Sequence, residues 1–389
     1  MKKRRVGIML ELMWPFRRHL DVFAGTQRFA KDAGAWVCEI DEFVHERGNA
    51  ARSQLAGYDG LIARATPQLA RLARRAKVPL VNVWYNSPEF ERLPGVFPDF
   101  AEVGRQAIEH LADRGFREFG CLSIPRERAH QVMINAFHEV VSGLGRQCHC
   151  LRAPRRYYRD GQAWTRFQRA LDEWISTWRP PIALFVAFTD ATTRYVVHAC
   201  RRHGLRVPED VALVTSSNEP MIAEMPPPSL TSVEVDYEQI GYQAARLLDR
   251  MMRGGEPAVR HPFVRPTGII ARDSTDFFAV DDEVVAAAMR FIEQHMREDI
   301  AVDDVAAAAG VSRRTLERRF QGSAGRSIAA EIRRLRVLKA KRLLAESDLL
   351  VKQIAREAGF RDPIRLNEVF LREEQMTPSE FRRRIRGES

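Results

Sequence analysis

The stretch VDDVAAAAGVSRRTLERRF occupies residues 302–320 and contains the end of one helical segment and the start of another. Gly310 follows the alanine-rich segment, and glycine is the usual residue just beyond a helix C-terminus because it adopts positive φ without strain. Ser312 stands directly before the next segment, where a side-chain oxygen can cap free backbone N–H groups. A helix, a short turn with glycine and a second helix form the helix-turn-helix layout.

The same layout occurs again in VKQIAREAGFRDPIRLNEVF, residues 351–370. Here Gly359 ends the first helix, Asp362 caps the second, and Pro363 takes the first helical position, which proline favours. In both units an alanine faces two apolar residues spaced i, i+4: Ala306 with Leu316 and Phe320, and Ala355 with Leu366 and Phe370. The repeat predicts two helix-turn-helix units, about 303–321 and about 351–373.

The second helix of each unit carries polar residues on the face away from its apolar pair. Arg314, Glu317 and Arg318 are spaced i, i+3, i+4, so all three can enter one groove of DNA. Arginine is the best bidentate reader of guanine, and glutamate can accept from cytosine. Arg365 and Asn367 are the corresponding candidates in the second unit. A solvated surface would explain one such helix, but two tandem units favour base reading by these five residues.

The charge distribution supports the same interpretation. The chain has 389 residues and a net charge of +10, and residues 313–389 alone hold 20 basic and 11 acidic side chains. A concentrated basic segment is the electrostatic footprint of a nucleic-acid binder. Residues 327–346 predict a helix of about 30 Å, close to the turn of B-DNA of about 34 Å, so one chain can place both units in successive major grooves. The expected phosphate contacts are Arg313, Arg336, Arg382 and Arg383.

Residues 4 to about 275 instead alternate short apolar runs with amphipathic segments. The runs predict strands over 6–10, 36–40, 60–63, 79–83, 119–124, 183–187 and 211–215. The segments between them predict helices over 20–33, 67–75, 100–114 and 191–203. This pattern is typical of parallel sheets covered on both faces. These elements exceed one ordinary doubly wound sheet, so we expect an α/β region of two Rossmann-like lobes, with ligands beyond the carboxyl ends of the strands.

The strand pattern stops near residue 276, and the remainder reads as an all-α region. We therefore divide the chain into a two-lobed sensor over 1–276, a connector over 277–283 and a DNA-binding domain over 284–389. Five scattered cysteines do not suit a disulfide-stapled secreted protein, and no run reaches the roughly 18 apolar residues of a membrane span. These features predict a cytoplasmic protein with reduced thiols and no membrane partner.

The C-terminal quarter resembles the DNA-binding domain of the AraC/XylS family of transcription regulators. The resemblance rests on LERRF at 316–320, the R-x-x-x-A-x-x-L-L pattern at 336–344, IAREAGF at 354–360 and MTPSEFR at 376–382. Residues 364–368, IRLNE, depart from the family's usual Ser-Tyr-Phe-Ser-Arg. The family implies a double-stranded DNA operator, RNA polymerase as a partner, a homodimer and activation of transcription.

The N-terminal region resembles the LacI-type, periplasmic-binding-protein-like sensor that xylose operon regulators carry. Matching stretches include 103–116, 189–191, 207–213, 228–233, 240–245 and 272–276. The resemblance implies a sugar-like effector gripped by polar side chains and aromatic rings, and it points to Glu11, Trp14, Phe16, Asp99, Asp190, Ser217 and Asn218. Ser217 stands where such sensors usually have an aspartate. A degenerate or enzyme-derived sensor that binds no sugar is the alternative.

Other chemistry finds little support in the sequence. Cys148, His149 and Cys150 could suggest a metal, but no second pair at ligand spacing follows, so we interpret them as exposed loop residues and expect no metal site. No GxGxxG, GxxxxGK[ST], HExxH or GxSxG motif occurs. Cys121 lacks the surroundings of a nucleophile elbow. We therefore expect no cofactor and no enzymatic activity.

Overall fold

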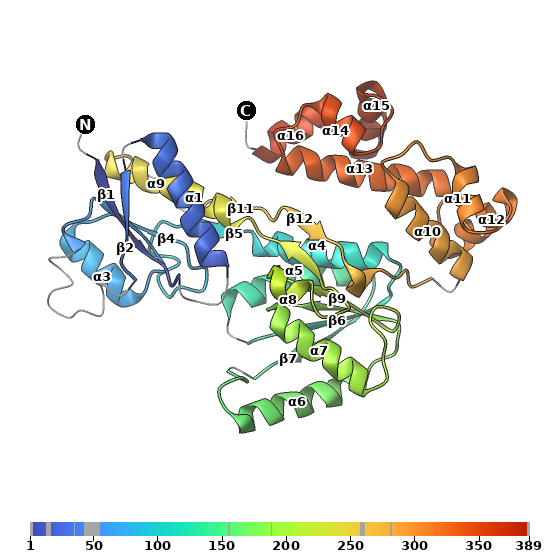
Figure 1. Cartoon of the computed structure of the whole chain (residues 1–389), viewed down its shortest axis with the longest axis horizontal. Coiled ribbons are helices and arrows are strands. Elements are labelled where there is room, and N and C mark those ends of the chain that lie inside the picture. Colours follow the sequence, from blue (N-terminus) through green and yellow to red (C-terminus); the bar gives the residue numbers. More distant parts are fainter. Residues whose placement is uncertain are drawn as a thin grey trace.

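The protein is described from a computed structural model. The structure describes residues 3–12, 17–34, 36–42, 55–125, 127–154, 156–187, 189–256, 261–280 and 282–386. Within these ranges no helix has the length and apolar character needed to cross a membrane. The α/β elements come first along the chain and the helical elements follow, and Figure 1 shows the helical region beside the second lobe of the sensor.

The first lobe is built on a parallel sheet in the order β2-β1-β3-β4. Its strands are β1 (Arg4–Met9), β2 (Trp36–Ile40), β3 (Gly60–Ala63) and β4 (Leu80–Asn82). Alternate residues along these strands face opposite layers. Val6, Ile8 and Ile62 pack toward α1 (Arg18–Ala33) and α9 (Tyr237–Met252), whereas Leu61 and Ala63 pack toward α3 (Pro67–Ala76).

The second lobe contains a larger sheet in the order β12-β10-β9-β8-β6-β7, in which only β12 is antiparallel. The strands are β6 (Glu118–Ser123), β7 (Cys148–Arg152), β8 (Ile182–Val186), β9 (Val211–Thr215), β10 (Thr231–Glu234) and β12 (Gly268–Ile270). α4 (Phe100–Asp113) and α5 (Arg128–Gly143) cover one face. α6 (Gly161–Ile175) and α7 (Asp190–Arg202) cover the other.

The chain passes between the lobes three times. It leaves the first lobe after β5 (Phe97–Pro98), returns between β10 and α9, and leaves again between β11 (Phe263–Val264) and β12. β5 and β11 pair in parallel, so two of the three passages lie side by side. Such a narrow connection allows the lobes to move as units about a hinge.

The C-terminal helices form two clusters joined by one long helix. α10 (Glu283–His295), α11 (Val302–Ala308) and α12 (Arg313–Ala324) pack around Leu316 and Phe320. α14 (Val351–Glu357), α15 (Pro363–Glu374) and α16 (Pro378–Arg386) pack around Leu366 and Phe370. α13 (Ile328–Glu346) contributes to both clusters, and Figure 1 shows it lying along α14 and α16 with one end toward α10. The predicted units at 303–321 and 351–373 and the predicted helix at 327–346 are confirmed, with ends that move by no more than three residues.

Two expectations about cysteine are wrong. Cys148, His149 and Cys150 lie in strand β7 rather than in a loop. Cys121 of β6 and Cys150 of β7 form a disulfide, although the composition suggested reduced thiols. β6 and β7 pair in parallel with Cys121 beside Cys150, a register that spacing along the sequence does not reveal.

Candidate functional sites

The first helix-turn-helix unit presents its predicted reading face to solvent. Gly310 has φ +68°, and the hydroxyl of Ser312 accepts from the Thr315 N–H at 3.3 Å, which sets where α12 begins. Leu316 and Phe320 are fully buried and fix the rotation of α12 about its axis. The opposite face is therefore directed outward, and Arg314, Glu317 and Arg318 are all exposed.

Exposed ion pairs hold part of this face in the free protein. Nε of Arg313 donates to Glu317 at 2.9 Å, and its Nη1 donates to Asp303 at 3.2 Å. Within the described part of the chain, Arg314 and Arg318 make no hydrogen bond or ion pair. Exposed pairs contribute at most about 1 kcal/mol, so a phosphate could replace either partner of Arg313.

The second unit has the same backbone but a different surface. Asp362 caps α15 by accepting from the Arg365 N–H at 2.8 Å, and Pro363 takes the first position. Nη1 of Arg365 donates to Glu368 at 2.9 Å, whereas the side chain of Asn367 is exposed. Ile364 is 71% exposed, and an apolar side chain at this position suits contact with a thymine methyl group.

Two of the four arginines that were predicted to contact phosphate make hydrogen bonds within the domain instead. Arg336 donates to the carbonyl oxygens of Met296 at 3.0 Å and Glu298 at 2.6 Å, which ties α13 to the end of α10. Arg382 donates to the carbonyl of Leu349 at 2.6 Å and so joins α16 to the segment that precedes the second unit. Both guanidinium groups join elements of the domain through these hydrogen bonds. Arg336 and Arg382 are therefore not kept among the predicted phosphate contacts. Arg383 is exposed and remains in the set with Arg313.

The predicted effector residues can be placed except for Trp14 and Phe16, which lie outside the described residues. Glu11 follows β1 and pairs with Arg64, which follows β3. The guanidinium of Arg64 lies 4.3 Å from the ring centroid of Trp84, which follows β4. These three side chains therefore gather at the carboxyl edge of the first sheet, where ligands of open α/β folds bind.

The facing edge of the second lobe carries Asn218 in a polar network. Its Oδ1 accepts from Arg272 at 2.8 Å, and its Nδ2 donates to the carboxylate of Glu234. Glu219 accepts from the backbone N–H of Arg17 at 3.1 Å, a hydrogen bond that joins the two lobes directly. Sequence reasoning missed Arg64, Trp84, Glu234 and Arg272. Their position along the sequence could have identified the first three, because Arg64, Trp84 and Glu234 lie at or just beyond the carboxyl ends of predicted or observed strands.

Asp99 and Asp190 have structural roles that the sequence did not indicate. Asp99 caps α4 by accepting from the Glu102 N–H at 3.0 Å. Asp190 is fully buried and accepts from Ser217 Oγ at 3.0 Å and from the Glu219 N–H at 2.7 Å. Asp190 and Ser217 thus hold the loop after β9 in place, and Asp99 sets the start of α4.

Burial makes Asp190 a source of pH dependence. Desolvation raises the pKa of its carboxyl group to about 6, above the ordinary value of 3.8, although hydrogen bonds from Glu219 and Ser217 oppose the shift. The folded protein therefore binds this proton more tightly than the unfolded chain, and the associated stability is lost as the pH rises through 6. One pKa unit corresponds to about 1.4 kcal/mol.

We accordingly expect Asp190→Asn to gain about 1.4 kcal/mol of stability relative to the wild type when the pH rises from 5.0 to 7.5. Urea unfolding of the full chain at the two pH values measures this difference. Asp172→Asn is the contrast, because hydrogen bonds from Arg202 and His203 outweigh desolvation and lower the pKa of Asp172. That variant should show no pH-dependent change over this interval, because Asp172 is ionised in both the folded and the unfolded chain above pH 5. A pH-independent effect of Asp190→Asn would contradict the assignment.

The sensor contacts the DNA-binding domain through the end of α4. The Arg114 side chain is 7% exposed, and it donates to the Thr275 carbonyl at 2.7 Å and to Glu293 of α10 at 2.6 Å. Its Nη1 also donates to Nδ1 of His110 at 3.1 Å. Burial lowers the pKa of His110 well below its usual value, so the imidazole is neutral and can accept this bond. Asp113 adds an ion pair with Arg334 of α13 at 2.6 Å.

Comparison with known proteins supports both halves of this description. Residues 108–275 match the periplasmic binding protein-like domain family, and residues 305–384 match a helix-turn-helix domain family. The xylose operon regulatory protein of Haemophilus influenzae is 27% identical over 346 residues, which cover 88% of both chains. That of Escherichia coli K12 is 29% identical over 358 residues, 88% of this chain and 89% of its own.

A solved structure extends the similarity to the whole chain. The structure of the xylose-binding transcription activator XylR matches with a TM-score of 0.60 and 26% sequence identity, and the match covers 98% of each chain. These similar proteins are transcription regulators.

Proposed function

We propose that this chain, a helix-turn-helix transcription regulator with a periplasmic-binding-protein-like sensor, activates carbohydrate-utilisation genes in response to a sugar-like molecule bound between its lobes. The observation that carries the proposal is the pair of matched helix-turn-helix units whose second helices direct polar side chains to solvent. The sensor contributes a polar network and an aromatic ring at facing strand ends.

The two units divide the work of DNA recognition. On α12, Arg314 and Arg318 make no ion pair within the described structure, and Glu317 accepts from Arg313. On α15, Arg365 is paired with Glu368 and Ile364 can offer only an apolar contact, which leaves Asn367 as the exposed candidate reader. The first unit therefore supplies most of the sequence specificity. Arg313 and Arg383 contact phosphates and add affinity without sequence preference.

The proposed effector site lies between Glu11, Arg64 and Trp84 of one lobe and Asn218, Glu234 and Arg272 of the other. A sugar offers hydroxyl groups that can exchange hydrogen bonds with this network, and an apolar ring face that can stack on indole. The existing ion pairs and hydrogen bonds keep these groups in defined positions before the ligand arrives. A ligand that binds across both lobes stabilises their closed arrangement over the open one.

α4 is the element that carries lobe closure to the DNA-binding domain. It begins at the passage between the lobes, where Asp99 caps it and the Asp99 N–H donates to the Val264 carbonyl at 2.8 Å. It ends at Asp113, next to Arg114, against α10 and α13. A rotation of the second lobe therefore moves α10 and α13, and with them both helix-turn-helix units. The active form is a cytoplasmic homodimer that recruits RNA polymerase from repeated half-sites.

A binding-site selection with the full-length chain tests the DNA assignment. The selection should return one sharply defined half-site and one diffuse half-site about a helical turn away, because the second unit offers fewer hydrogen-bonding groups. Two equally sharp halves would contradict the division of labour. No enriched sequence at all would contradict the regulator itself.

A thermal-shift screen of pentoses, hexoses and sugar acids on the same chain tests the effector. A ligand that binds only the folded state must raise the melting temperature. Trp84→Ala should reduce the shift that any active sugar produces. If no sugar shifts the transition, the sensor is degenerate, which is the alternative function.

Arg318→Ala should weaken binding to the selected operator by about 1–3 kcal/mol and relax the preference at one base pair. The reason is the loss of a bidentate base contact from an exposed side chain that makes no ion pair within the described structure. Arg383→Ala is the matched control and should weaken all sequences equally while it reduces the salt dependence. Competition titrations at two salt concentrations measure both effects. Equal, sequence-independent losses would show that Arg318 contacts only phosphate.

A further inference from the structure

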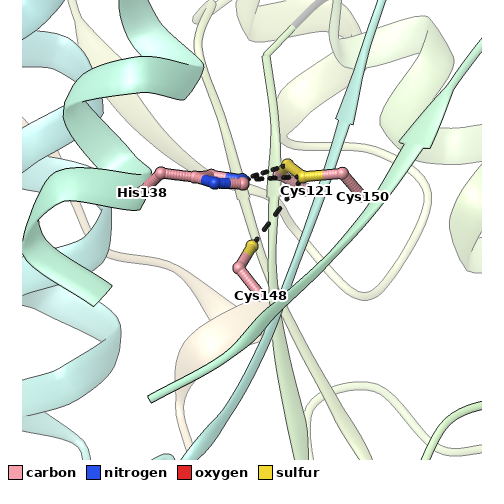
Figure 2. Close-up of side chains that lie close together, drawn as sticks. All are labelled: Cys121, His138, Cys148 and Cys150. Atoms are coloured by element: carbon pink, nitrogen blue, oxygen red, sulfur yellow. Dashed lines mark hydrogen bonds between the residues drawn. A yellow bond between two sulfur atoms is a disulfide. The ribbon is translucent and has the colours of Figure 1, made fainter. Parts of the chain in front are cut away.

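A cluster of three cysteines and one histidine lies on one face of the second lobe, away from both proposed sites. It consists of Cys121 of β6, Cys148 and Cys150 of β7, and His138 of α5. Their sulfur and ring-nitrogen atoms all lie within 4.8 Å of one another. Figure 2 shows the imidazole of His138 directed at the sulfur atoms from the helix beside the strands.

The sheet register explains why these residues converge. Side chains at i and i+2 of a strand point to the same face, so Cys148 and Cys150 share one side of β7. Cys121 is the register partner of Cys150 on β6 and lies on that side too. α5 covers this face and places His138 above it. The site therefore depends on two strands and one helix, which no local spacing in the sequence indicates.

We propose that the reduced protein binds one zinc ion at Cys121, His138, Cys148 and Cys150. Three thiolates and one imidazole are a ligand set that structural zinc sites use. The inference is independent of the DNA and effector assignments, because none of these residues takes part in either proposed site.

Two of the observed separations already suit a tetrahedral ion. With bonds of about 2.3 Å to sulfur and about 2.0 Å to nitrogen, tetrahedral ligands lie about 3.8 Å apart for two sulfurs and about 3.5 Å apart for sulfur and nitrogen. Sγ of Cys148 lies 3.9 Å from Sγ of Cys150, and Sγ of Cys121 lies 3.6 Å from Nε2 of His138.

Two other separations are too short for a shared ion, and both involve Cys150. Its sulfur lies 2.9 Å from Nε2 of His138 and is bonded to Cys121. Cys150 is exposed, so its side chain can rotate once that bond is reduced. A thiol reductant supplies two electrons and two protons to give the two free thiols. Zinc binding then releases three protons, one from each cysteine, while neutral His138 donates its lone pair.

A bound ion would stabilise the edge strand of the second sheet. β7 is the terminal strand in the order β12-β10-β9-β8-β6-β7, so it has a neighbour on one side only. The four ligands would join this strand to β6 and to α5. The stability of the second lobe would then depend on zinc, because an ion that binds only the folded state raises the free energy of unfolding.

Zinc titration of the full-length chain tests the proposal. The protein is purified with a phosphine reductant, stripped with a chelator and supplied with Zn²⁺ alone, and bound metal is measured by elemental analysis after desalting. We expect one zinc per chain, a higher melting temperature and visible absorption bands of tetrahedral, sulfur-rich cobalt when Co²⁺ replaces zinc.

Cys148→Ser is the decisive variant, because it removes one ligand and leaves the Cys121–Cys150 pair intact. It should lose stoichiometric zinc and the cobalt bands, and His138→Gln should do the same through a different element. Cys38→Ser is the matched control in the other lobe and should retain the ion. A reduced wild type that takes up no zinc would overturn the proposal, as would zinc binding that survives both ligand substitutions. In either case the cluster is only a disulfide with a neighbouring thiol.

Discussion

Gly359→Ala is expected to destabilise the DNA-binding domain by about 4 kcal/mol or more and to abolish operator binding. Gly359 lies between α14 and α15 with φ +80°, where a side chain is strained. An added Cβ would also lie 2.0 Å from the carbonyl oxygen of Met296 at the end of α10. That oxygen accepts from Arg336, so any shift of the backbone breaks the bond that ties α10 to α13.

Gly310→Ala is the matched control in the first unit. Gly310 has φ +68°, but an added Cβ would meet nothing within 4 Å. Its cost should be the backbone strain alone, about 1–2 kcal/mol. Urea unfolding of the full chain and operator titration measure both variants. Equal destabilisation by the two substitutions would contradict the close approach of Met296 to the second turn.

Arg114→Ala is expected to separate the DNA-binding domain from the sensor. The substitution removes a buried guanidinium and leaves Glu293, His110 and the Thr275 carbonyl without their donor. The Glu293 side chain is 33% exposed and regains water, so the cost comes mainly from the acceptors left inside, at about 1–3 kcal/mol for each buried group without its partner. We expect proteolytic cleavage within the connector, residues 277–283, to become at least about tenfold faster, since about 1.4 kcal/mol suffices for that factor.

Two further variants make this test specific. Arg117→Ala removes an exposed arginine three residues away and should leave the cleavage rate unchanged. Arg114→Lys keeps the charge but lacks the planar fork that reaches several acceptors at once, so it should be intermediate. If Arg114→Ala is cleaved no faster than Arg117→Ala, other contacts hold the junction. The same pair of variants should show whether an effector found in the screen still alters operator affinity.

The helix-turn-helix units could be predicted from the sequence because their determinants are local. A glycine, a capping residue and an i, i+4 apolar pair act within about 20 residues, so Gly310, Ser312, Gly359 and Asp362 mark the turns correctly. The burial of Leu316 and Phe320 then fixes which side of α12 faces outward. The same local logic placed the strands, because a buried strand reads as an apolar run wherever it lies in a sheet.

The roles of individual polar residues could not be predicted in this way. Arg336 and Arg383 are both arginines in a basic region, yet one donates to two backbone carbonyls and the other is exposed. Asp190 follows a strand as a ligand-binding residue would, but it is fully buried against the loop after β9. Which partner a long or charged side chain meets depends on elements far away in the chain.

The sequence by itself determined that this chain folds as an α/β region followed by two helix-turn-helix units, and it determined which helix face of the first unit reads outward. Those features follow from hydrophobic periodicity and capping, which are properties of neighbouring residues. The tertiary structure alone decided that Arg114 joins the two regions and that Cys121, His138, Cys148 and Cys150 meet. Sheet order and helix packing bring such residues together, and neither is encoded by the spacing of the residues along the chain.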